Sequence, residues 1–223
     1  MNFLGHAAVA AWVRPDPAFV LGAMLPDFCS MVRARLLSTS NDDVDAGIAF
    51  HHQTDAAFHS LASFVRLTSA AFKELLEGGV GRGPARAAAH VSTELLLDAV
   101  TMRDPAVLVL YVDALDAGAE DVLGRHLRFE DDQHAARWAR LRLRLRNSGL
   151  PSSWEQARIA DRLSAALACR PKLALDERAE QAVGVLLPRW RERVEGASEA
   201  LFSELSARLG VVRKDRAWLG RQE

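Results

Sequence analysis

Hydrophobic positions recur at intervals of three and four residues along almost the whole chain, which is the period of an amphipathic α-helix. Alternating β-branched and aromatic residues bounded by turn residues, the pattern typical of strands, are nearly absent. The pattern predicts helices over residues 2–13, 17–25, 44–77, 84–101, 105–125, 132–147, 153–169 and 176–209, with the third one breaking near residues 59–60. We therefore expect an all-α fold, a single bundle of about eight helices. Residues 1–223 would form one domain, with residues 1–125 as the core that carries any site and residues 126–223 as a C-terminal helical part.

Pro26 interrupts the second of these helical patterns. Proline has no amide hydrogen, and it disfavours helical geometry in the residue before it. We therefore predict that the helix ends at Leu25 and that the chain turns at Asp27. The Asp27 side chain would then either point into the bundle from a helix end or cap a helix that begins near residues 29–30.

Histidines concentrate in the first 90 residues, which contain five of the seven: His6, His51, His52, His59 and His90. Two triplets of polar residues repeat at four-residue intervals: His51, Asp55, His59 and His90, Glu94, Asp98. On a helix, residues at this spacing lie close together along one side, with neighbouring Cβ atoms about 5–6 Å apart. Imidazole and carboxylate groups so placed can share a divalent cation.

A histidine four residues before an aspartate is, taken alone, most often a surface pair that contributes a few tenths of a kcal/mol. Two features favour a site over that interpretation. Residues 87–89 and 95–97 are apolar, so the second triplet would face inward, where unpaired polar groups are costly. His6 and Asp27 also lie in apolar surroundings. The spacing therefore predicts a metal site.

The composition excludes several classes of protein but does not identify a function. The chain has 49% hydrophobic and 26% charged residues and a net charge of −1, so it lacks the basic excess of general nucleic-acid-binding proteins. Two cysteines, Cys29 and Cys169, exclude a disulfide scaffold and a cysteine-based zinc finger. The apolar start of the chain lacks the basic residues of a signal peptide, and no apolar run of about 18 residues would span a membrane. We expect a cytoplasmic protein.

Three segments resemble the acyl-carrier-protein phosphodiesterase family, which is similar to the all-α HD-type metal phosphohydrolases. They are Met1-Asn2-Phe3-Leu4-Gly5-His6, Leu21-Gly22 with Leu25 and Asp27-Phe28, and Gly47-Ile48 with His51 and Asp55. The resemblance covers about the first 100 residues and implies an HD-domain-like helical bundle with a divalent cation, typically manganese. It also implies hydrolysis of the phosphodiester that joins phosphopantetheine to a carrier-protein serine. Two acidic residues on a later helix of the family are matched by Glu94 and Asp98.

The chain departs from the family pattern at two places. The family carries two arginines between the histidine and the aspartate, where this chain has His52, Gln53 and Thr54. A family histidine follows the second acidic residue, where this chain has Ala99. Losing arginines weakens phosphate recognition, because the guanidinium group binds phosphate in a bidentate manner.

Two alternatives follow. The chain also resembles the zinc-dependent phospholipases C, which pair a His-x-x-x-Asp with a downstream His-x-x-x-Glu, here His51 with Asp55 and His90 with Glu94. The departures alternatively favour a catalytically inactive helical binding protein on the same scaffold.

Spacing and resemblance together suggest roles for individual residues in a phosphodiester hydrolase. The expected metal ligands are His6, Asp27, His51, Asp55, His90 and Asp98. Glu94 would be a further ligand or the general base, and His59 or His52 would protonate the leaving oxygen. Manganese is the cation that the resemblance implies, with zinc or iron as alternatives. The substrate would be a phosphate ester, and the protein partner an acidic carrier protein.

Arginines also gather in residues 137–146, the most concentrated basic run of the chain. On a helix, Trp138, Leu141 and Leu145 would form an apolar stripe beside them. The run either docks an acidic partner or forms a solvated face balanced by Glu130, Asp131 and Asp132; the charge pattern favours the solvated face.

Overall fold

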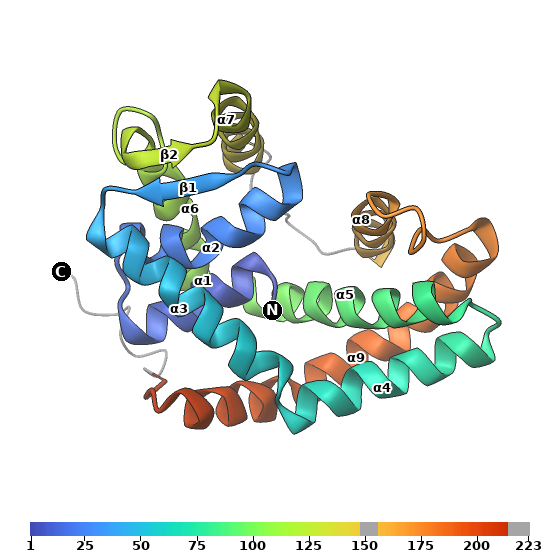
Figure 1. The fold of residues 1–223 in the computed structure, drawn as a ribbon. Helices are drawn as coiled ribbons and strands as arrows, with labels where there is room; N and C mark the ends of the chain where they lie inside the picture. The colour runs from blue at the N-terminus through green and yellow to red at the C-terminus, as the bar shows by residue number, and fades with distance from the viewer. Residues whose placement is uncertain (148–155, 214–223) are drawn as a thin grey trace. The chain divides into compact units, whose positions relative to one another are not determined.

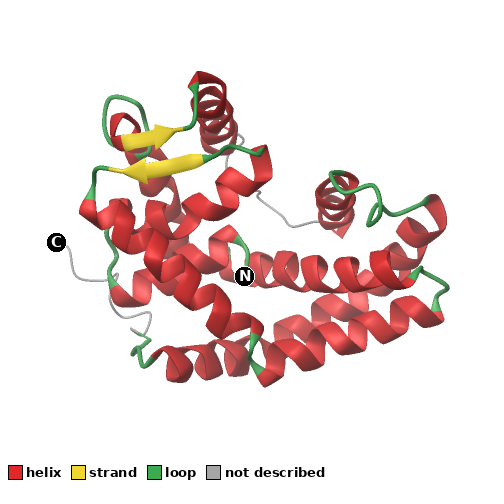
Figure 2. Ribbon diagram, viewed as in Figure 1, coloured by secondary structure: helices red, strands yellow, loops and turns green. Residues whose placement is uncertain are grey.

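The fold is all-α, as predicted, in a computed structural model that describes residues 1–147 and 156–213 (Figures 1 and 2). In the described part, the helices are α1 (Phe3–Val13), α2 (Pro17–Val32), α3 (Asp42–His59), α4 (Ala62–Glu77), α5 (Arg82–Thr101), α6 (Pro105–Ala117), α7 (Asp132–Asn147), α8 (Gln156–Ala168) and α9 (Glu177–Leu209). No helix among these residues is both long and apolar enough to cross a lipid bilayer.

The chain divides into two compact units, each built from separate segments. The described part of unit 1 comprises residues 1–57, 101–147 and 206–213, and that of unit 2 comprises residues 58–100 and 156–205. The predicted division into residues 1–125 and 126–223 stays a prediction.

Unit 1 packs α1, α2, α3, α6 and α7 around aromatic side chains. Phe28 of α2 contacts Phe3 of α1 and Trp138 of α7, with ring centroids 5.3 and 5.7 Å apart. Tyr111 of α6 stacks on Phe3 with ring centroids 6.0 Å apart. All four rings are buried, and Trp138 is only 3% exposed.

Helix α2 continues through Pro26, so the prediction that the chain turns at Asp27 is wrong. Its start follows the expected chemistry, since Asp16 accepts a hydrogen bond from the Phe19 amide at 3.0 Å and Pro17 occupies the first turn. Proline removes one helical hydrogen bond, but burial of Leu25 and Phe28 on either side of it holds the helix together. Asp27 therefore lies between the two ends of α2 and not at a helix end.

Two glycines bring α2 and α3 into backbone contact. A Cβ atom added at Gly22 would lie 2.2 Å from the carbonyl oxygen of Val44, and one added at Gly47 would lie 2.1 Å from that of Phe19. Only a residue without a side chain fits at either position. This close approach brings the helices that carry Asp27 and His51 together.

The structure also contains two short strands that the hydrophobic pattern does not predict. β1 (Leu36–Thr39) pairs antiparallel with β2 (Leu127–Phe129), with Leu36 opposite Phe129 and Thr39 opposite Leu127. Strands of four and three residues are too short to show a recognisable alternation. The helix predicted over 105–125 is too long, because the short strand that follows gives no signal that would end it. Helix α6 ends at Ala117, and a 3₁₀ turn, η1 (Gly124–His126), leads into β2.

Unit 2 contains α4, α5, α8 and most of α9. The predicted break after His59 is confirmed, since α3 ends there and α4 begins at Ala62. Glu204 of α9 caps α4 from a distance: its carboxylate accepts hydrogen bonds from the amides of Ala62 and Ser63 at 2.9 and 3.2 Å. Glu74 of α4 pairs with Arg189 of α9 at 2.6 Å. These contacts join the two ends of α4 to the long helix.

Candidate functional site

Three helices of unit 1 bring two histidines and an aspartate together. His6 of α1, Asp27 of α2 and His51 of α3 each offer a ligand atom, and these atoms all lie within 4.8 Å of one another. The two imidazole rings stack with centroids 4.0 Å apart. Asp55 lies beside them, with its Oδ1 3.7 Å from Nε2 of His6, and Oδ2 of Asp27 lies 3.9 Å from the same nitrogen. We call these four residues the His6 cluster.

Burial keeps both histidines of the His6 cluster uncharged. His6 is 1% and His51 6% exposed, because α1 is buried along almost its whole length and α3 packs closely on α2. Burial lowers the pKa of His6 to about 4 and lowers the pKa of His51 below its ordinary value. Neutral imidazole is the form that binds a metal, so both rings are ready to bind one at neutral pH.

Each histidine is held through its Nδ1 atom. Nδ1 of His51 lies 2.9 Å from the Ala23 carbonyl oxygen, and Nδ1 of His6 lies 3.0 Å from the Thr54 hydroxyl. A carbonyl oxygen only accepts, so the Nδ1 atom of His51 carries the hydrogen and its Nε2 keeps a lone pair. Nε2 of His6 is buried and has no hydrogen-bond partner among the described residues. Such an atom between two carboxylates fits a cation bound there.

The carboxylates form the open side of the cluster. Their side chains are 26% exposed at Asp27 and 37% at Asp55, whereas the His6 side chain is fully buried. The amino group of Met1 lies 2.9 Å from Oδ1 of Asp55, so Asp55 binds a positively charged group in this structure. A cation held by the histidines from within would therefore be open to solvent on its carboxylate side, as a catalytic site requires.

Unit 2 contains a second group, formed by His59 at the end of α3 and by His90 and Glu94 of α5. We call it the His59 cluster. Oε1 of Glu94 lies 3.0 Å from Nε2 of His59 and 3.1 Å from Nε2 of His90, and the two imidazoles stack at 4.9 Å. Phe64 contacts both rings edge-on, with centroids 5.3 Å away. This set of two imidazoles and one glutamate is a known zinc-binding combination.

Glu94 is a poor candidate for a general base in this arrangement. Burial raises the pKa of its carboxyl, but hydrogen bonds from His59 and His90 outweigh that effect and hold the pKa below its ordinary range. A carboxylate whose pKa is lowered in this way accepts a proton less readily at neutral pH. The geometry suits Glu94 better as a ligand, the other role predicted for it.

The structure thus brings together some of the predicted ligands but not all of them. His6, Asp27 and His51 converge with Asp55 beside them, whereas His90 belongs to the His59 cluster. Asp98 is fully buried on α5 and belongs to neither group. His52, a predicted proton donor, is exposed, and its ring lies edge-on to His51 at 5.3 Å.

Two residues that contact the histidines of the His6 cluster, Ala23 and Thr54, were not predicted as site residues. The Ala23 carbonyl has no sequence signal, since every residue has a carbonyl group. Thr54 was named only as a departure from the family pattern. Its position three residues after His51 on the same helix allows its hydroxyl to donate a hydrogen bond to the His51 carbonyl oxygen.

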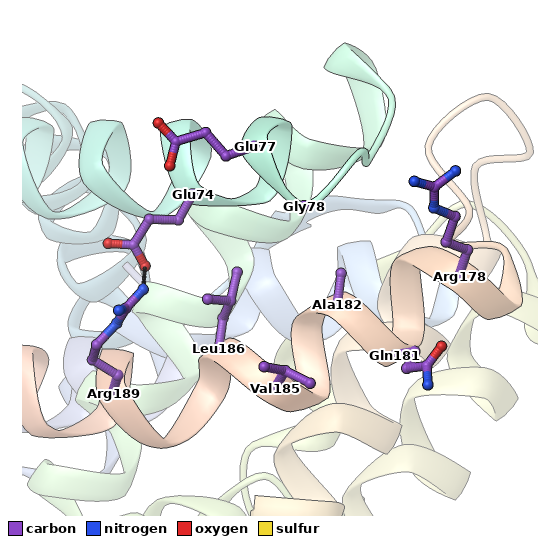
Figure 3. A pocket seen from close by; sticks show the side chains of 9 residues that line it. All are labelled: Glu74, Glu77, Gly78, Arg178, Gln181, Ala182, Val185, Leu186 and Arg189. Carbon is purple, nitrogen blue, oxygen red and sulfur yellow. Dashed lines mark hydrogen bonds and ion pairs between the residues drawn. The ribbon is translucent and has the colours of Figure 1, made fainter.

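One cavity lies away from both clusters. It has a volume of about 470 Å³ in unit 2 between the end of α4 and the start of α9, and Figure 3 shows its lining, with the Glu74–Arg189 ion pair at one end and Arg178 at the other. Ala182, Val185 and Leu186 provide apolar parts of its lining, and no residue of either cluster lines it.

The arginine-rich helix α7 is largely explained by unit 1 itself. Arg137 and Arg142 donate hydrogen bonds to the carbonyl oxygens of Arg33 and Leu115, and Arg146 pairs with Asp116 at 2.6 Å. Of the predicted apolar stripe, Trp138 and Leu141 are buried and Leu145 is half-buried. In the described part of the chain, the arginines of α7 do not pair with the acidic residues that the sequence suggested, since Glu130 pairs with Arg35 and Asp131 with His134. Docking of an acidic partner on this helix stays a prediction.

Comparisons with models of protein families, with curated proteins and with solved structures find no match.

Proposed function

We propose that this protein is a divalent-metal-dependent phosphodiester hydrolase whose cation binds at the His6 cluster. One observation carries the proposal: the buried Nε2 of His6 has no hydrogen-bond partner among the described residues and lies 3.7 and 3.9 Å from two carboxylates. Leaving such a nitrogen unpaired costs about 1–3 kcal/mol, which a bound cation would offset.

The donor set suits a divalent cation. Two neutral imidazoles and the carboxylates of Asp27 and Asp55 offer mixed nitrogen and oxygen ligands with two negative charges. Such ligands suit manganese, iron and zinc better than calcium or magnesium, which prefer oxygen alone. Manganese remains the proposed cation because the resemblance to the acyl-carrier-protein phosphodiesterases, an HD-type family, implies it.

A bound cation would polarise a phosphate oxygen and lower the pKa of a water molecule. The residues of the chain would bind, orient and protonate. His6 and His51 hold the cation from the buried side, and the exposed carboxylate side admits the phosphate ester. In this proposal His52 donates the proton to the leaving oxygen, because it is exposed and touches His51.

The proposed substrate is the phosphodiester of a phosphopantetheinylated carrier protein, with that acidic protein as the partner. Gln53 and Thr54 replace the arginines of the family pattern, so the phosphate would be bound mainly by the cation.

A second candidate function, a zinc-dependent phospholipase C-like phosphodiesterase, is favoured by the His59 cluster. Two histidines and a glutamate joined at 3.0 and 3.1 Å provide a second place for zinc. The two candidates differ in stoichiometry. The first predicts one cation per chain, and the second predicts at least two, one of which is lost in Glu94→Gln.

Metal content tests the proposal most directly. Protein purified without chelator is analysed by elemental mass spectrometry and assayed with bis(p-nitrophenyl) phosphate in the presence of Mn²⁺ or Zn²⁺. Asp27→Asn and Asp55→Asn keep the shape of each side chain and should lose one cation equivalent and all turnover. Asp45→Asn removes an exposed carboxylate from the same helix α3 and should change neither.

The result that refutes the proposal is an unchanged metal content in both variants of the cluster. Binding of one cation without turnover would instead favour the inactive binding protein. Circular dichroism of each variant separates loss of the ligand from loss of the fold.

A further inference from the structure

Thr54 occupies the position between two ligands of the His6 cluster on α3, and its side chain contacts a third. It is fully buried. Its hydroxyl lies 2.9 Å from the carbonyl oxygen of His51 in the preceding turn and 3.0 Å from Nδ1 of His6 on α1. No other hydrogen bond of Nδ1 of His6 is found among the described residues.

The directions of these two hydrogen bonds follow from the atoms involved. A hydroxyl group has one hydrogen, and that of Thr54 is donated to His51, whose carbonyl oxygen only accepts. The contact with His6 must then run the other way, with Nδ1–H of His6 donating to the hydroxyl oxygen. Neutral His6 therefore carries its hydrogen on Nδ1, and the lone pair lies on Nε2, the atom beside Asp27 and Asp55.

We propose that Thr54 is a positioning residue of the metal centre, which fixes the tautomer and the ring orientation of His6 so that Nε2 binds the cation. This inference rests on the proposed function, because it assigns Thr54 to the same site. Threonine suits the task, since its β-branched side chain has few rotamers in a helix and its hydroxyl bonds readily to a carbonyl of the preceding turn.

His51 provides an internal comparison. Its Nδ1 atom is held by a backbone carbonyl, that of Ala23, which no side-chain substitution removes. A change at Thr54 should therefore alter the tautomer of His6 and leave that of His51 as it is. General loosening of unit 1 would affect both rings.

The first test needs no metal. Long-range ¹H–¹⁵N NMR spectra of the metal-free protein at pH 7 distinguish a histidine with hydrogen on Nδ1 from one with hydrogen on Nε2. We expect Nδ1–H for both His6 and His51 in the unaltered chain. A His6 signal of the Nε2–H type would overturn the inference, whether or not the protein hydrolyses a phosphodiester.

The second test compares two substitutions. Thr54→Val keeps the shape but removes the hydroxyl, so the His6 hydrogen should move to Nε2, towards the carboxylates. The affinity for Mn²⁺ or Zn²⁺, measured by dye competition, should then fall about 10–100-fold, the usual effect of removing a partner that orients a ligand. Thr54→Ser keeps the hydroxyl and should restore both the Nδ1–H signal and most of the affinity.

Two results would overturn the inference: Nδ1–H at His6 with unchanged affinity in Thr54→Val, or equal loss of affinity in the serine and valine variants with no change of tautomer. If Thr54→Val does not fold, the NMR spectrum of the unaltered chain and the Thr54→Ser variant decide. Absence of metal binding by the unaltered chain would refute the proposed function, while the NMR result would still test the link between Thr54 and the His6 tautomer.

Discussion

Substitution of Gly22 by alanine should separate the two helices on which the His6 cluster depends. The added Cβ would lie 2.2 Å from the Val44 carbonyl oxygen and 2.9 Å from Cα of Gly47. An ordinary carbon–oxygen contact is about 3.3 Å, so α2 and α3 would have to part by about 1 Å. Both neighbours are backbone atoms, and no flexible side chain can move to make room.

The expected loss of stability follows from opposing contributions. Alanine in a helix is favoured over glycine by about 1 kcal/mol, and burying its methyl group adds about 0.8 kcal/mol. Against these, parting two packed helices costs about 3 kcal/mol or more, because contacts along the whole interface are lost. The hydrogen bond from His51 to the Ala23 carbonyl, worth about 1 kcal/mol, spans the same interface. We expect a net destabilisation of about 2–3 kcal/mol.

Urea unfolding followed by circular dichroism measures the effect, and Gly196→Ala in α9 is its matched control. Nothing lies within 4 Å of a Cβ at Gly196, so alanine should stabilise the protein there by about 0.5–1 kcal/mol. Metal affinity should fall in Gly22→Ala and stay unchanged in Gly196→Ala. Equal or greater stability of Gly22→Ala would refute the view that backbone contact between α2 and α3 builds the site.

Two further predictions concern stability. The pKa of His6 is about 4 in the folded chain, against 6.5 for an exposed histidine, so between these pH values the unfolded chain binds a proton that the folded chain does not. The metal-free protein should therefore lose about 3 kcal/mol of stability as the pH falls through this window. His6→Gln should reduce this pH dependence of the free energy of unfolding, measured by urea unfolding at several pH values. Some slope should remain, because burial also lowers the pKa of His51. A slope that is undiminished in His6→Gln would assign the titration to groups other than His6. Glu204→Ala removes the acceptor of the Ala62 and Ser63 amides and should cost about 1–2 kcal/mol in thermal unfolding, whereas Glu192→Ala, an exposed glutamate of the same helix, should cost under about 0.5 kcal/mol. Equal effects of the two glutamate variants would contradict the remote cap.

The hydrophobic periodicity predicts most helices correctly, because the apolar positions that define a helix lie within the helical segment itself. The range predicted for α7 agrees with the structure, and α1 and α9 each differ from their predictions by one residue at the start. The errors lie where distant contacts decide. Helix α2 tolerates Pro26 because its flanking residues are buried against other helices, and β1 exists only because β2, about 90 residues further along the chain, pairs with it.

Helical geometry explains why the candidate residues do not all gather in one place. Residues four apart on a helix are offset by about 40° around its axis, and residues eight apart by about 80°. His51 and Asp55 can therefore face the same ligand, whereas His59, eight residues after His51, points elsewhere and joins His90 and Glu94. On α5 the same drift separates Asp98 from His90.

A stripe at four-residue spacing thus marks candidates, and the neighbouring helices decide how the candidates are shared. Contact between Gly22 and Gly47 determines that Asp27 meets His51, and neither glycine would be chosen from spacing as a site residue. A ligand side chain can be substituted without moving the helices. A change in the contact between α2 and α3 moves both Asp27 and His51. For this reason variants of the cluster test the proposed chemistry, and the glycine variant tests how the fold builds it.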